Sequence, residues 1–249
     1  ISLKLEGNVN QYNTNNEYKT RADSANRLNG AYGIGHSEKF QNNFSAKLFL
    51  KKEINEDIQM DLLIGGDMWS SKREGSSVGT SGGFKVPDFY SISNSKNPAS
   101  ASGSVWDKKK LNSLYGFYNV SYKNELYLSL TARNDWSSTL VYPIDGHGDF
   151  SYFYPSGSLA WVASETFELP EVISFLKLRT SYAIVGNDTG AWNLSTGFEV
   201  DTENYNTGID MFKYSDNQYI TSLLKPEKKY SFGTGIDLRL FNNRVKLDV

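Results

Sequence analysis

Cysteine is absent from the 249 residues of the chain. A disulfide framework and any metal site built on thiolates are therefore excluded. The absence does not identify a cellular compartment, because many exported bacterial proteins also lack cysteine.

Long apolar runs and an excess of one charge are missing as well. No stretch of about 18 apolar residues occurs in the sequence, which excludes a transmembrane helix but not strands of about ten alternating residues in a β-barrel. Lys and Arg number 26 against 28 Asp and Glu, a net charge of −2. No electrostatic feature therefore indicates a nucleic-acid partner.

The signatures of catalysis and of bound cofactors are also lacking. No nucleophile is spaced to meet a base, and no two carboxylates are placed to share one cleft. The two histidines, His36 and His147, stand in stretches expected to be loops. We expect no enzyme activity, no cofactor and no metal site. A loop calcium site is left open by four carboxylates without EF-hand spacing: Asp145, Asp149, Asp188 and Asp201.

What the sequence does contain is alternation with a period of two. From Leu114 to Tyr122 and from Leu126 to Ala132, every second residue is mostly apolar, and the residues between them mix rings, hydroxyls and charges. Such a period places one set on each face of a strand. The turn at 123–125 joins the two segments into a hairpin. One face of this hairpin therefore meets an apolar environment, and the other meets water or polar partners.

The same pattern predicts nine strands and no helix of ordinary length. Four connections are expected to be long loops and to alternate strictly with short turns, with one helical turn near Pro170 and a two-residue hairpin at Asn242-Asn243. The expected strands are 1–13, 39–52, 58–71, 111–122, 126–136, 153–164, 175–185, 228–240 and 244–249, and the expected long loops are 14–38, 72–106, 137–152 and 186–227.

Alternation alone fits both a soluble β-sandwich and a membrane barrel. Strict sorting of long and short connections puts the long loops at one end, as in outer-membrane barrels. Expected strand lengths of about 12–15 residues exceed those of soluble sheets. We therefore predict an all-β, antiparallel up-and-down transmembrane β-barrel segment. A secreted or surface β-sandwich that binds carbohydrate remains the alternative.

An ordered set of short motifs indicates a family. It comprises Arg133-Asn134-Asp135-Trp136-Ser137-Ser138, Tyr152-Phe153-Tyr154-Pro155-Ser156, Ala160-Trp161, Ser164-Glu165-Thr166-Phe167, Phe175-Leu176-Lys177-Leu178-Arg179-Thr180-Ser181-Tyr182, Gly186-Asn187, Gly235-Ile236-Asp237 and Phe241-Asn242-Asn243-Arg244. In this order, over 111–249, the set resembles the SusC/RagA-type TonB-dependent transporters of Gram-negative outer membranes. Residues 1–110 match that family only in their strand rhythm.

The resemblance implies a barrel of about 22 strands with an N-terminal plug domain. It also implies energy supplied through TonB, a SusD-like surface lipoprotein as partner, and import of oligosaccharides or peptides across the outer membrane. Residues 1–249 would then form part of one barrel domain in contact with outer-membrane lipid. We expect the plug and the remaining strands to belong to other parts of a longer protein.

Two groups of residues are candidates for contact with a solute. Charged residues opposite the apolar rows should face the barrel lumen, where they contact a solute, or form salt bridges with the plug. Three tryptophans near the outer strand ends could stack on sugar rings, although an aromatic belt at the membrane interface explains them at least as well. The charged group is Arg133, Asp135, Lys177, Arg179, Asp237 and Arg239, and the tryptophans are Trp69, Trp106 and Trp136.

Overall fold

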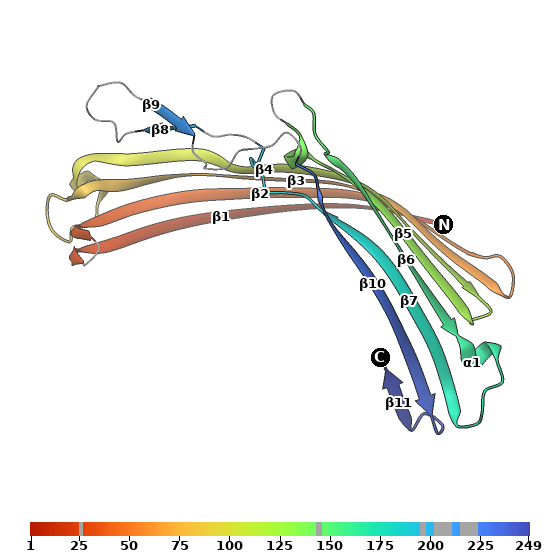
Figure 1. The fold of residues 1–249 in the computed structure, drawn as a ribbon. Coiled ribbons are helices and arrows are strands. Elements are labelled where there is room, and N and C mark those ends of the chain that lie inside the picture. The colour runs from red at the N-terminus through yellow and green to blue at the C-terminus, as the bar shows by residue number, and fades with distance from the viewer. Residues whose placement is uncertain (25–26, 143–145, 195–197, 202–210, 215–223) are drawn as a thin grey trace. The chain divides into compact units, whose positions relative to one another are not determined.

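The computed structural model describes residues 1–24, 27–142, 146–194, 198–201, 211–214 and 224–249. Nine strands form one antiparallel sheet in the order β1-β2-β3-β4-β5-β6-β7-β10-β11, and β8 pairs with β9 in a separate two-stranded sheet (Figure 1). Except for this inserted hairpin, each strand of the large sheet pairs with its neighbour in sequence. The predicted nine-stranded up-and-down meander is confirmed.

The strands fall into a long and a short group. Four strands have 23 to 28 residues: β1 (Ser2–Ser24), β2 (Arg27–Glu53), β3 (Ile58–Phe84) and β4 (Ser95–Tyr122). Four have 12 to 15: β5 (Leu126–Ser137), β6 (Ser151–Val162), β7 (Ile173–Asn187) and β10 (Glu227–Leu240). The remaining elements are β8 (Phe198–Asp201), β9 (Met211–Tyr214), β11 (Val245–Asp248), α1 (Ala163–Thr166) and the 3-10 turns η1 (Ile92–Asn94) and η2 (Ser138–Leu140).

Two of the predicted long loops are wrong. Most of 14–38 belongs to β1 and β2, and most of 72–106 belongs to β3 and β4. These stretches lack apolar alternation, but aromatic packing on glycine holds them as a sheet: a Cβ on Gly33 or Gly79 would lie 2.2 or 2.5 Å from atoms of the Tyr18 side chain. Only 25–26 separate β1 from β2, so the strict alternation of long and short connections fails at its first step.

Two compact units divide the chain. The first contains Ile1–Glu6, Phe44–Met68 and Leu111–Val249, and the second contains Gly7–Asn43 and Trp69–Lys110. Within the first unit, the turn between β4 and β5 has positive φ at Lys123 (50°) and Asn124 (56°). The Glu125 N–H donates to the Tyr122 carbonyl at 2.9 Å. Two successive positive φ angles suit the twist of a tight hairpin.

Strand register defines two faces of the first unit. Ser113 lies opposite Asp135 and Tyr115 opposite Arg133 between β4 and β5, while Arg133 lies opposite Tyr154 between β5 and β6. We call this side the polar face. Continued through β7, β10 and β11, it carries Lys177, Arg179, Asp237, Arg239, Lys246 and Asp248.

The opposite side, the apolar face, is exposed. Leu114 is 54% exposed, Phe153 53% and Phe232 74%. Burial is concentrated on the polar face instead, where Tyr115, Asp135 and Tyr152 are each less than 9% exposed. The sheet therefore reverses the arrangement of a soluble protein. Among the described residues, no helix combines the length and the apolar character needed to cross a membrane.

Candidate functional site

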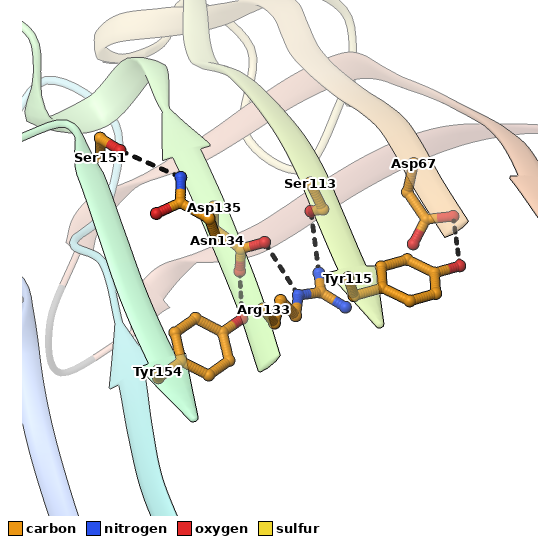
Figure 2. A network of polar contacts seen from close by, with 8 residues as sticks. All are labelled: Asp67, Ser113, Tyr115, Arg133, Asn134, Asp135, Ser151 and Tyr154. Carbon is orange, nitrogen blue, oxygen red and sulfur yellow. Dashed lines mark hydrogen bonds and ion pairs between the residues drawn. The ribbon is translucent and has the colours of Figure 1, made fainter. Parts of the chain in front are cut away.

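The polar face of β3 to β6 carries a connected set of side chains around Arg133 (Figure 2). Asp67 comes from β3, Ser113 and Tyr115 from β4, Arg133 and Asp135 from β5, and Tyr154 from β6. We call these six residues the Arg133 network. All of them belong to the first compact unit.

Arg133 is held from three directions. Its Nε donates to Asp135 Oδ1 at 2.8 Å, and its Nη2 donates to Ser113 Oγ at 2.9 Å. The guanidinium carbon lies 5.5 Å from the centre of the Tyr115 ring, a cation–π distance. Two hydrogen bonds and a stacked ring leave the planar group little freedom, so Arg133 is fixed in one orientation.

Asp135 is the most buried charge of the network, with 4% of its surface exposed. One carboxylate oxygen accepts from Arg133 and the other from the Tyr154 hydroxyl. Burial of a carboxylate is tolerated only when its oxygens are hydrogen-bonded and its charge is balanced. At the other end of the network the Tyr115 hydroxyl donates to Asp67 Oδ1 at 3.2 Å, so the bonds link four successive strands.

Glycines make room for the rings of this region. A Cβ on Gly65 would lie 2.6 Å from the ring of Tyr115, and a Cβ on Gly186 would lie 2.6 Å from the ring of Tyr152. Tyr152 in turn stacks on Tyr154, with ring centres 5.8 Å apart and an angle of 20° between the planes. Glycine inside a strand is typical of such close approaches.

A second polar cluster joins the end of β5 to the residue that follows β7. The Ser137 hydroxyl donates to Asp188 Oδ2, and the Thr139 hydroxyl donates to the same oxygen at 3.3 Å. Ser137 is 1% exposed and Leu140 beside it 1%. Asp188, which follows β7 directly, therefore fastens the turn η2 after β5.

The six predicted lumen residues all lie on the polar face, and their contacts fall into four separate groups. Arg133 and Asp135 pair in the network, and Arg179 pairs with Asp248 of β11. Arg239 donates to Asp237 on its own strand, with Nη2 and Oδ2 3.2 Å apart. Lys177 contacts the ring of Tyr127 at 5.9 Å. That this face encloses a lumen stays a prediction.

The three tryptophans lie on three different strands. Trp136 lies on the apolar face, paired with Ser151 and 37% exposed. Trp69 is half-buried in β3, and Trp106 lies in β4 with a side chain outside the described part of the structure. Stacking of these residues on a solute stays a prediction.

Sequence reasoning missed Tyr115 and Tyr154 as partners of the charged residues. Their positions in the alternation placed them on the polar face, but the pairing of Tyr115 with Asp67 joins residues 48 positions apart. Gly65 inside a strand was the available signal, since such a glycine often lies under a ring from a neighbouring strand.

The second compact unit contains a separate hollow of about 550 Å³ across β1 to β4. His36, expected in a loop, lies in β2 beside it, and its Nδ1 is 2.8 Å from Asn15 Oδ1. The Lys19 ammonium and a hydrogen bond from the Tyr32 hydroxyl hold the pKa of the Glu17 carboxyl below its usual range.

No group of three or more His, Asp or Glu side chains among the described residues could hold a metal ion. Of the four carboxylates considered for calcium, Asp145 lies outside the described residues, and the side chain of Asp201 lies outside them as well.

Comparison with known proteins finds solved structures with a similar fold but no matching family model. No model of a protein family matches the chain, and no curated protein matches it. Among solved structures, the chain is similar to the RagAB peptide transporter with a TM-score of 0.79 and 22% identity. Two states of the RagAB peptide importer, closed-closed and open-open, match with TM-scores of 0.78 and 0.77, each at 21% identity.

Each match covers 99% of this chain and 27% of the other chain, so the chain spans about a quarter of the length of the proteins it resembles. At this level of identity the likeness concerns the fold. The chain therefore has the fold of a segment of the RagAB transporter, and the resemblance to SusC/RagA-type transporters found in the sequence is confirmed for the fold.

Proposed function

We propose that the chain is part of the wall of an outer-membrane active transporter of a Gram-negative bacterium. The whole protein imports oligosaccharides or peptides, draws energy through TonB and works with a SusD-like surface lipoprotein. It performs selective passage and breaks no bonds. The structural neighbours are a peptide transporter and a peptide importer, which favours peptides as the solute.

The observation that carries this proposal is the exposed apolar face. A soluble protein does not leave rows of Leu, Phe and Tyr from adjacent strands uncovered, because each exposed apolar side chain forfeits roughly 25 cal/mol per Å². In a bilayer the same rows are solvated by acyl chains, while strand pairing satisfies the backbone hydrogen bonds.

The height of the apolar rows matches a bilayer. Leu126 and Trp136 lie on the apolar face of β5, ten positions apart. That separation is about 33 Å along the strand, or about 25 Å along the membrane normal at a tilt near 40°. Aromatic residues stand at both ends, with Trp136 and Phe153 at one and Tyr122 and Trp161 at the other, as in the girdles of outer-membrane barrels. These rows belong to the first compact unit.

The alternative, a soluble β-sandwich, requires a second sheet over the apolar rows. Within the described residues the only other sheet is the two-stranded β8–β9 ribbon. Four-residue strands cannot cover rows drawn from β4 to β10. A membrane environment therefore accounts for the exposed face better.

Fractionation of cells that express the full-length protein tests the proposal. We expect the protein in the outer membrane, resistant to extraction by urea and released by detergent, and we expect deletion of TonB to abolish uptake of its solute. Recovery of the full-length protein in soluble form without detergent would contradict the proposal.

A further inference from the structure

A hollow on the polar face of β6, β7 and β10 is distinct from the Arg133 network. Its volume is about 380 Å³. Small side chains, among them Ser158, Ala160, Ser181 and Gly233, leave the space open. Two cations, Lys177 and Arg179, line it beside these small residues.

Lys177 stands at this hollow without a carboxylate to neutralise it. Among the described residues, its side chain forms no hydrogen bond or ion pair, and its ammonium lies near the ring of Tyr127, whose centre is 5.9 Å from Nζ. Asp237 lies directly opposite Lys177 in the strand register, but its carboxylate is bound by the guanidinium of Arg239. The ammonium of Lys177 is therefore available to another anion.

Arg179, the second cation of the hollow, is paired with a carboxylate. It lies across Gly235 of β10, where a Cβ would be 2.3 Å from its Nε, and its Nη2 donates to Asp248 of β11. The guanidinium thus lies beside the hollow, while Lys177, on a flexible stem, can adjust to a ligand.

The polar-face rows of β7, β10 and β11 carry an excess of positive charge. They hold Lys177, Arg179, Lys229, Arg239 and Lys246 against Glu227, Asp237 and Asp248, an excess of two positive charges. At the Arg133 network, Arg133 and the nearby Lys47 balance Asp67 and Asp135. An anionic ligand is therefore favoured at the hollow.

We propose that the hollow lined by Lys177, Arg179, Ser158 and Ser181 binds a carboxylate of the solute, so that the transporter prefers acidic peptides. This inference rests on the proposed import function and names the class of peptide. Lys177 supplies the free charge, Arg179 a second cation, and the two serine hydroxyls can donate to a carboxylate oxygen.

The test measures binding of two labelled peptides to the purified full-length protein in detergent. The peptides have equal length, and one carries glutamate where the other carries glutamine. We expect the wild type to favour the glutamate peptide, with a preference that shrinks as salt rises. Lys177→Gln should reduce the preference about fivefold, the effect of one partly exposed charge pair, and Lys177→Arg should retain it. The matched control is Lys52→Gln at the exposed end of β2, which should bind as the wild type does.

Equal binding of both peptides by the wild type, or an unchanged preference in Lys177→Gln, would overturn the inference. If Lys177→Gln instead lowers the unfolding temperature without peptide and leaves the preference intact, another part of the protein fills the hollow, and the inference is equally overturned. Uptake by cells separates the two proposals. If peptide binding depends on Lys177 but cells take up neither peptide, the proposed import function fails and the present inference stands. If cells take up both peptides equally whether or not Lys177 is present, the present inference fails and the import function stands.

Discussion

Gly65 on β3 lies directly under the ring of Tyr115 on β4, and a Cβ at Gly65 would be 2.6 Å from Tyr115 Cε2. The ring cannot move freely away from the sheet, because its hydroxyl donates to Asp67 and its face contacts the guanidinium of Arg133. One missing methyl group therefore determines where the Arg133 network is held.

Gly65→Ala should accordingly destabilise the protein by about 1–3 kcal/mol, the usual cost of overpacking. Gly116→Ala is the matched control, since its Cβ would meet nothing nearer than the Leu63 carbonyl oxygen at 3.7 Å. Urea unfolding of the purified full-length protein in detergent measures both. An equal loss in the two variants would show that alanine acts through the strand backbone and not through Tyr115.

Asp135→Asn should destabilise the protein through the Arg133 network. It replaces the buried carboxylate that accepts from Arg133 at 2.8 Å and from the Tyr154 hydroxyl with a neutral amide, and the Arg133 side chain, 35% exposed, loses its ion pair, a loss of about 1–3 kcal/mol. The double variant Arg133→Met with Asp135→Leu should lose less than the sum of the single changes, because it leaves no unpaired charge. Unfolding free energies of the two single variants and the double variant form the cycle, and strict additivity would mean that the pair is not coupled.

Tyr154→Phe isolates one hydrogen bond of the same carboxylate. The ring remains stacked on Tyr152, and only the hydroxyl that donates to Asp135 is lost. We expect a loss of about 1–3 kcal/mol, since a buried acceptor loses a donor. Tyr118→Phe, on the apolar face of β4, is the control that removes a hydroxyl from the other side of the sheet.

Alternation in the sequence predicted the faces of β4, β5, β7 and β10 because a period of two needs no knowledge of strand partners. Leu114 and Leu130 were assigned to one face and Arg133 and Asp135 to the other, and the register agrees. The second compact unit was missed because its strands depend on Tyr18 lying over Gly33 and Gly79, a relation between three strands that no local pattern contains.

Only part of the Arg133 network could be predicted from the sequence, for the same reason. Arg133 and Asp135 are two positions apart and on one face, so their proximity follows from the sequence. The contact of Arg133 with Ser113 and Tyr115 depends on the β4–β5 register, and the link to Asp67 depends on the pairing of β3 with β4. The hydrophobic pattern excludes only those register shifts that move a strand by an odd number of residues. Which residue lies opposite which across two strands is therefore known only from the structure.

Leu130→Arg tests the orientation of the sheet directly. Leu130 lies on the apolar face of β5, 43% exposed and near the middle of the rows between Leu126 and Trp136. If lipid surrounds this face, a guanidinium at mid-height should cost about 2–4 kcal/mol. The neighbouring Ser129 lies on the polar face, so Ser129→Arg introduces the same side chain on the same strand and should cost far less. Urea unfolding in lipid vesicles measures the difference. If water covered the apolar face, Leu130→Arg would be the milder change, because an exposed charge on a solvated strand costs little, and the membrane assignment would fail.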